Sequence, residues 1–284
     1  MSKHDFPQIV WQIWLTTPNG PDAATVKDEH KHLIQTWTEF NPHWTHIMID
    51  EEYANDLIAE HFTAYPQIRR VFDRLQIPIF KADLLRLLVL YVHGGLYSDL
   101  DTECIRPVES WDLEELSNST ELVVGLEYDN FDKVERQGWS DDIQIATWTI
   151  MARAKSKRLL ETLLLMIELV SHTMDVYVMA EQLFGEKDDD VLDTIGPRGF
   201  TRALLKVVSK SEGYQVAHAQ LSMLDVPKNF GGVRFLPVTA FACEQPHSRS
   251  GRWNDPAVLV THHYHHSWKK NVVHASCQHG RCKS

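Results

Sequence analysis

Two aspartates one residue apart are the residues of this chain best suited to chemistry. Asp99 and Asp101 close the stretch IFKADLLRLLVLYVHGGLYSDLD, which begins at Ile79. On an extended strand, residues i and i+2 point to the same side, so we expect both carboxylates to face one site. Their hard oxygens suit Mn²⁺ or Mg²⁺ and leave coordination positions open for phosphate. The pair therefore predicts a divalent metal site that can hold a nucleotide diphosphate.

The residues before the acid pair predict an apolar helix that ends in a sharp turn. Asp83 and Arg86 are three residues apart and so share a face of this helix, while Gly94 and Gly95 end it. The turn can bring the charged pair close to the two aspartates in space. The alternative for Asp83 and Arg86 is an exposed ion pair with no part in binding.

A helix, two glycines, a tyrosine and an Asp-x-Asp pair in this order resemble a known signature. The string ADLLRLLVLYVHGGLYSDLD is similar to that of glycosyltransferase family 32, and the large clostridial toxins have a similar sugar-transferring domain. The family includes fungal initiation-specific α-1,6-mannosyltransferases and inositol-phosphoceramide mannosyltransferases. Further matching segments are PQIVWQIWLT, NPHWTHIMID, IQIATWTIMARAKSKRLLETLL, TIGPRGFTRALL and HHYHHSW, so the resemblance covers nearly the whole chain.

The resemblance implies a metal-dependent, retaining glycosyltransferase that moves a hexose from a nucleotide sugar to a hydroxyl acceptor. The first expectation for the donor is GDP-mannose, and a UDP-hexose is the alternative. By residue matching, Asp101 anchors the metal and Asp99 is its partner. Asp83 and Arg86 match residues that grip the donor sugar and support its leaving diphosphate.

Two aromatic residues match nucleotide-binding positions of the family. Trp14 resembles a tryptophan that stacks on the base, and Tyr97 resembles a residue that contacts the nucleotide. For each of them, a place in the hydrophobic core is the alternative.

The histidine-rich segment near the C-terminus resembles a late element of the family that closes over the donor. On this matching His263 is the third metal ligand, with its neighbour His262 as the alternative, and Ser267 and Trp268 cover the phosphates. A separate zinc site is a weaker interpretation, because one strand cannot direct four histidines to one ion.

Alternating strand and helix patterns predict an α/β fold. Strands are expected at 9–15 and 44–50 and helices at 22–40, 51–62 and 77–93, followed by less regular elements that include strands at 122–126, 235–243 and 257–262. This order favours a Rossmann-like, mostly parallel sheet flanked by helices, and the resemblance implies a GT-A-type single domain over 1–284. We expect a nucleotide-sugar and metal half at 9–103, an acceptor-side half at 104–270 and a flexible tail at 271–284.

Composition narrows the classes of partner. The 284 residues carry a net charge of -11, which argues against nucleic acid as a partner. No apolar run reaches the roughly 18 residues of a membrane span. The family's fungal members carry a membrane anchor in the Golgi, so we expect either a cytoplasmic protein or a Golgi-lumen catalytic domain without its anchor.

Other classes of function stay open at this point. DLDT is similar to the Asp-x-Asp-x-Thr/Val loop of phosphohydrolases that become phosphorylated on aspartate. In this chain Thr102 comes one position too early for that pattern. A non-catalytic module that binds nucleotide sugars is a further alternative. The acceptor can be a glycan, a lipid or a small molecule.

Overall fold

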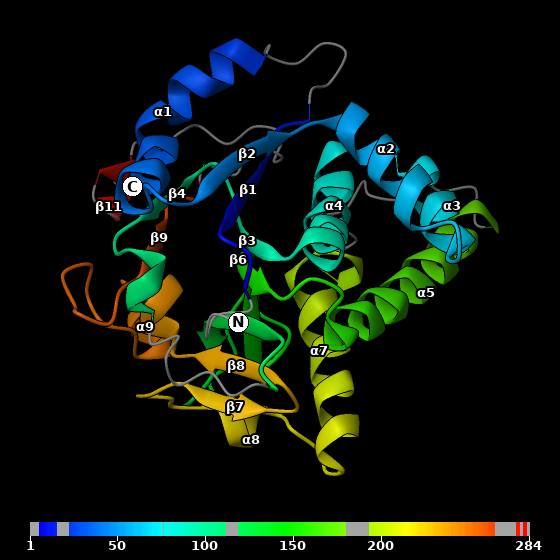
Figure 1. Cartoon of the computed structure of the whole chain (residues 1–284). Coiled ribbons are helices and arrows are strands. Elements are labelled where there is room, and N and C mark those ends of the chain that lie inside the picture. Colours follow the sequence, from blue (N-terminus) through cyan, green and yellow to red (C-terminus); the bar gives the residue numbers. More distant parts are fainter. Residues whose placement is uncertain are drawn as a thin grey trace.

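A seven-stranded sheet forms the centre of the molecule in the computed structural model (Figure 1). The structure describes residues 6–15, 23–75, 77–111, 119–179, 193–264, 277–278 and 281–282. The strands, in the order in which they lie side by side, are β2 (Thr45–Ile49), β1 (Ile9–Ile13), β3 (Gly95–Ser98), β6 (Ile143–Ala152), β5 (Leu122–Asp129), β8 (Val233–Leu236) and β7 (Lys228–Phe230).

Most strands of this sheet run in one direction. Strand β1 is parallel to β2 and to β3, and β5 is parallel to β8. Strand β6 lies antiparallel between β3 and β5, so these two neighbours share one direction. Only β6 and the short β7 run the opposite way among the described strands. The mostly parallel α/β architecture predicted from the sequence is confirmed.

Helices cover both faces of the sheet. In Figure 1 α2, α3, α4, α5 and α7 lie on one side and α1 and α9 on the other. The helices are α1 (Ala23–Phe40), α2 (Glu51–His61), α3 (Pro66–Arg74), α4 (Pro78–His93), α5 (Lys157–Met179), α7 (Pro197–Glu212), α8 (His218–Leu221) and α9 (Val238–Phe241). Two pairs of short strands lie outside the seven-stranded sheet. They are β4 (Thr102–Cys104) with β9 (Val260–His262), and β10 (Cys277–Gln278) with β11 (Arg281–Cys282).

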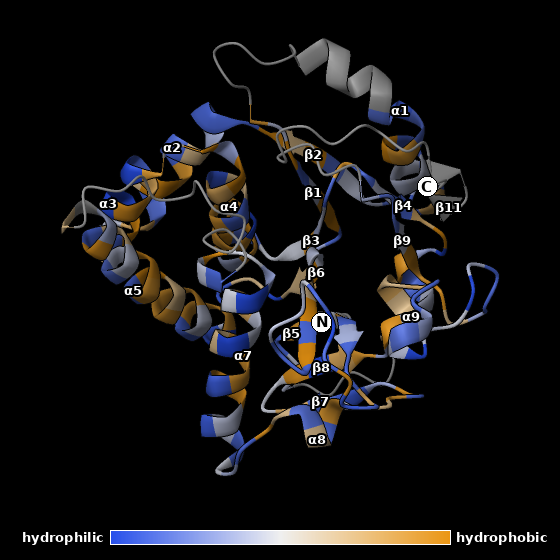
Figure 2. Ribbon diagram, turned by 180° about the vertical axis from the view of Figure 1, so that it is seen from behind, coloured by the Kyte–Doolittle hydropathy of each residue, from blue (hydrophilic) through white to orange (hydrophobic). Residues whose placement is uncertain are grey.

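The strands at the centre are buried on both faces because helices lie above and below them. Every residue of β3, β5 and β6 is buried, and Figure 2 shows much of this region in the hydrophobic colours. Such strands read as nearly continuous apolar runs, as in LVVGLEYD of β5. A charged residue in one of them therefore needs a specific partner.

The Gly94-Gly95 turn lets α4 lead directly into β3. Both glycines have positive φ angles, +69° and +97°. A Cβ atom on Gly95 would lie 2.6 Å from the carbonyl oxygen of Ile9 on the neighbouring strand β1. Trp11 further holds the turn by donating from Nε1 to the carbonyl oxygen of Gly94 at 2.8 Å. Only glycine fits here, because the chain turns within contact distance of β1.

Several elements differ from the prediction. The strand before the acid pair ends at Ser98, and Asp99 to Thr102 form a turn closed by a 3.2 Å hydrogen bond from Thr102 N to Asp99 O. The expected strand at 235–243 stops at Leu236, because Pro237 has no amide hydrogen and α9 follows it. Helix α3 and strand β6 were not expected as elements.

The central sheet takes β1, β2 and β3 from the predicted nucleotide-sugar half and β5 to β8 from the predicted acceptor-side half. The division into these halves and the flexibility of the tail remain predictions.

Among the described helices, none combines the length and the apolar character that crossing a bilayer requires.

The glycine turn generates a prediction about stability. Replacing Gly95 by Ala should lower the free energy of unfolding by more than the roughly 1–2 kcal/mol of a positive φ angle alone, because the new Cβ also meets Ile9. The matched control is Gly213→Ala, where φ is +76° but nothing lies within 4 Å of the added Cβ. Urea unfolding of both variants measures the difference, and equal losses would contradict the close approach.

Candidate metal and donor site

The carboxyl ends of parallel strands place the predicted residues at one edge of the sheet. Strands β1 and β3 are parallel neighbours, so Trp14 after β1 and Asp99 after β3 leave the sheet on the same side. Ligands of such sheets collect at this edge. The turn after β3 then carries Asp101 to β4, which pairs with β9 near the other end of the chain.

A possible metal centre forms where this turn meets β9. Asp99, Asp101 and His262 each offer a ligand atom, and these atoms lie within 4.8 Å of one another. The register of β4 and β9 places Thr102 opposite His262, so the imidazole comes beside the turn. His262 Nε2 lies 3.1 Å from Asp101 Oδ1. Two carboxylates and one imidazole fit a divalent cation such as Mn²⁺.

The structure brings His262 to the acid pair and turns the side chain of its neighbour His263 elsewhere. The His263 side chain turns to Glu103, with 3.1 Å between Nε2 and Oε2, while the His263 amide donates to the carbonyl oxygen of Asp101. Adjacent residues of an extended chain point to opposite sides, so His262 and His263 cannot share one site. His262, the predicted alternative, meets the acid pair. Ser267 and Trp268 lie outside the described residues.

Asp83 and Arg86 form a buried ion pair beside the acid pair. Their side-chain atoms approach to 2.7 Å, and Arg86 also lies 3.4 Å from Asp99. Asp83 is 5% exposed and Arg86 is 4% exposed, which excludes the exposed ion pair. Arg86 donates to the carbonyl oxygen of Thr147 at 3.0 Å and lies 4.9 Å from the centre of the Tyr97 ring. The Tyr97 hydroxyl donates to Asp99.

Burial and neighbouring charges shift the pKa values of this cluster in opposite directions. Burial raises the pKa of Asp83 to about 7, although the positive charge of Arg86 lowers it. Burial likewise raises the pKa of Asp99 against the effect of Arg86. For His262, burial lowers the pKa, but the charges of Asp101 and Asp99 outweigh burial and raise it overall. The site is therefore rich in negative charge that a cation can compensate.

Trp14 comes directly after the carboxyl end of β1, at the same edge of the sheet as Asp99. Its amide donates to the carbonyl oxygen of Ile49 at 2.9 Å, its side chain is partly exposed, and its buried Nε1 has no hydrogen-bond partner among the described residues. Gln12, which the sequence analysis missed, lies on the same face of β1. It is fully buried and donates to the carbonyl oxygen of Asp99 at 3.3 Å, so it helps to hold the turn from Asp99 to Thr102.

A second polar cluster at the same edge was also missed. Glu127 of β5 accepts a 2.6 Å hydrogen bond from Gln144 Nε2 of β6, and both side chains are buried. Trp148, on the same strand as Gln144, stacks on His262 with 4.4 Å between ring centres, and Tyr264 lies 4.1 Å from the same imidazole. Glu127, an acidic residue that follows the apolar run of β5, was the signal for this cluster.

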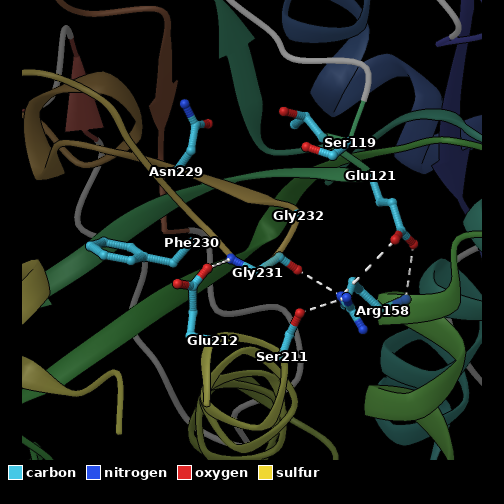
Figure 3. A pocket seen from close by; sticks show the side chains of 10 residues that line it. Ser119, Glu121, Arg158, Ser211, Glu212, Asn229, Phe230, Gly231 and Gly232 are labelled. Atoms are coloured by element: carbon cyan, nitrogen blue, oxygen red, sulfur yellow. Dashed lines mark hydrogen bonds and ion pairs between the residues drawn. The ribbon is translucent and has the colours of Figure 1, made fainter. Parts of the chain in front are cut away.

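A pocket at the opposite edge of the sheet is separate from this site (Figure 3). Glu121 and Gly232 of its lining stand just before β5 and β8, at the amino ends of these parallel strands. In its centre Arg158 donates to the carbonyl oxygen of Gly231 and to the Ser211 hydroxyl, each at 2.6 Å. Arg158 thus ties α5 to α7 and to the turn between β7 and β8, which is a structural role.

Comparison with known proteins agrees with the geometry at the acid pair. Residues 27–118 match the family model described as a glycosyltransferase sugar-binding region containing a DXD motif. The chain is 25% identical over 286 residues to the initiation-specific α-1,6-mannosyltransferase of Candida albicans. That match covers 93% of this chain and 72% of the relative.

Two further similarities extend over most of the chain. The initiation-specific α-1,6-mannosyltransferase of Schizosaccharomyces pombe is 27% identical over 276 residues, which is 93% of this chain and 64% of that protein. The solved structure of the PaToxG glycosyltransferase is similar with a TM-score of 0.46 and 16% identity, covering 73% of this chain and 72% of that one. The predicted resemblance is confirmed: the chain contains a glycosyltransferase sugar-binding region with a DXD motif at residues 27–118, and it is similar to named mannosyltransferases over most of its length.

Proposed function

We propose that this protein is a metal-dependent, retaining glycosyltransferase that moves mannose from GDP-mannose to a hydroxyl group. The observation that supports this most strongly is the convergence of Asp99, Asp101 and His262 beside the buried pair of Asp83 and Arg86. The relatives that match 93% of the chain are named mannosyltransferases. A UDP-hexose remains the alternative donor.

In this proposal Asp99, Asp101 and His262 hold a divalent cation. When bound, the cation neutralises the charge that develops on the departing diphosphate. An imidazole nitrogen in the ligand set favours Mn²⁺ over Mg²⁺, which prefers oxygen ligands throughout. Trp148 stacks on the His262 ring, and Asp101 lies at its Nε2, so the ring orientation is held in advance.

Asp83 and Arg86 bind the donor at the sugar and its diphosphate. Arg86 keeps its charge at every physiological pH, and its planar guanidinium donates in fixed directions. The Thr147 carbonyl and the Tyr97 ring hold that plane in place, as their contacts with Arg86 indicate. A guanidinium already fixed before the donor arrives loses little entropy on binding.

We assign the two aromatic residues different tasks. Trp14 stacks on the nucleotide base, a contact worth about 1–3 kcal/mol with little base selectivity. Its partial exposure at the strand end fits that role. Tyr97 is only 2% exposed and bonds Asp99, so it orients the carboxylate and reaches the nucleotide only through it. Ser267 and Trp268 remain the predicted cover of the phosphates.

The reaction exchanges one bond to the anomeric carbon for another. The acceptor oxygen bonds to that carbon, the bond from the carbon to the phosphate oxygen breaks, and the acceptor proton passes to the departing phosphate. This front-face course retains the anomeric configuration. The proposal leaves the acceptor open among a glycan, a lipid and a small molecule.

The proposed function predicts slow, metal-dependent hydrolysis of the donor when no acceptor is present. Purified protein with Mn²⁺ should release mannose from GDP-mannose faster than it releases sugar from UDP-glucose, UDP-galactose or UDP-GlcNAc. EDTA should abolish the release. Faster release of sugar from a UDP-sugar would show that only the assignment of the donor is wrong. If no nucleotide sugar is hydrolysed and none raises the melting temperature, the proposed function is contradicted.

The two adjacent histidines provide a matched test of the metal ligand. We expect His262→Ala to raise the Kd for Mn²⁺ about tenfold or more, because a ligand is lost. His263→Ala should change it about twofold at most, because His263 bonds Glu103 and faces away from the acid pair. Electron paramagnetic resonance of free Mn²⁺ measures both constants, with melting temperatures as the check on folding. A larger loss in His263→Ala would overturn the assignment.

A further inference from the structure

The polar residues at the edge of the sheet continue beyond His262. Trp148 contacts that imidazole, and Gln144, on the same strand β6, holds Glu127. The pairing of β5 with β6 is irregular between Leu126 and Tyr128, so Glu127 lies at a break in the register. Such breaks re-aim side chains next to active sites.

Several buried polar atoms in the cluster of Trp148, His262, Tyr264 and Gln245 lack partners among the described residues. They are Trp148 Nε1, Gln245 Oε1 and His262 Nδ1. Gln245 reaches this group by donating from Nε2 to the Tyr264 hydroxyl at 2.9 Å. A buried polar atom without a hydrogen bond is costly, so a cluster of them indicates a place where a ligand completes the bonds.

The hydrogen bonds of Glu127 itself are also incomplete. It is 8% exposed, and Gln144 Nε2, bonded to Oε2, is its one hydrogen-bond donor within the described part of the chain. A carboxylate can accept several hydrogen bonds, which leaves Oε1 available to a donor. A negatively charged ligand would be repelled here, whereas hydroxyl groups are neutral donors that suit a carboxylate.

We infer that Glu127, held by Gln144 and flanked by Trp148 and Gln245, binds a hydroxyl group of a neutral polyhydroxylated acceptor. This inference rests on the proposed function and names the substrate class of the acceptor side. The hydroxyl bound by Glu127 is not the reacting one, whose proton passes to the departing phosphate. Glu127 therefore ends the reaction unchanged, and it fixes the orientation of the acceptor toward the anomeric carbon.

The test separates transfer from hydrolysis. With GDP-mannose and Mn²⁺, both transfer to methyl α-D-mannopyranoside and release of free mannose are measured for the wild type and for Glu127→Gln. We expect kcat/KM for transfer to fall about tenfold or more, because a charge-assisted hydrogen bond is lost. The rate of donor hydrolysis should stay within about twofold of the wild type, because a water molecule that attacks the donor is not oriented by Glu127. Glu161→Gln, on α5 beside Arg158, is the matched control.

Each other outcome contradicts a defined part of the inference. Unchanged transfer in Glu127→Gln, or a parallel loss of transfer and hydrolysis, would overturn the role of Glu127. A wild type that hydrolyses the donor but transfers to none of methyl mannoside, myo-inositol and glycerol would overturn the acceptor class. A wild type that neither binds nor hydrolyses nucleotide sugars would instead refute the proposed function. If Glu127→Gln does not fold, Gln245→Ala, on a partly exposed loop, should show the same selective loss of transfer.

Discussion

The compensation of buried negative charge around Asp99 is the constraint on which the rest of the site depends. Asp83, Asp99 and Asp101 lie close together at the edge of the sheet, and taking charges out of water costs several kcal/mol for each unless they are paired. Arg86 compensates Asp83 and Asp99, and His262 lies against Asp101. One fixed cation and one imidazole face three carboxylates, so the divalent cation that we propose would complete the charge balance.

This arrangement explains why distant parts of the chain must come together before the site exists. Asp101 and His262 are 161 residues apart and meet through the pairing of β4 with β9. The Gly94-Gly95 turn brings α4 beside β3, so that Arg86 reaches Asp99. If Glu127 binds the acceptor, His262 lies between the donor and acceptor sides and contacts both through Asp101 and Trp148.

Local patterns predicted the parts of the site that local geometry determines. The i, i+3 spacing of Asp83 and Arg86 and the glycine turn were enough to place them near the acid pair. Local patterns did not show that His262, and not the preferred His263, meets the acid pair, because this depends on the register of two strands far apart in the chain. The turn from Asp99 was read as a strand because the i, i+2 spacing of the aspartates also fits a strand, and the bonds that hold Asp99 to Trp148 and Gln12 come from distant parts of the chain. Glu127 was missed because its environment is made by β6 and by Tyr264, which the sequence alone does not bring together.

In the proposed function a divalent cation lies between the turn from Asp99 to Thr102 and β9. The most direct measurement is anomalous diffraction from a crystal of the protein soaked with Mn²⁺ and GDP. We expect an anomalous peak within coordination distance, about 2.0–2.6 Å, of Asp101 and His262, and close to Asp99 directly or through water. A peak at His263 and Glu103, or an ordered GDP with no peak at the acid pair, would contradict the account.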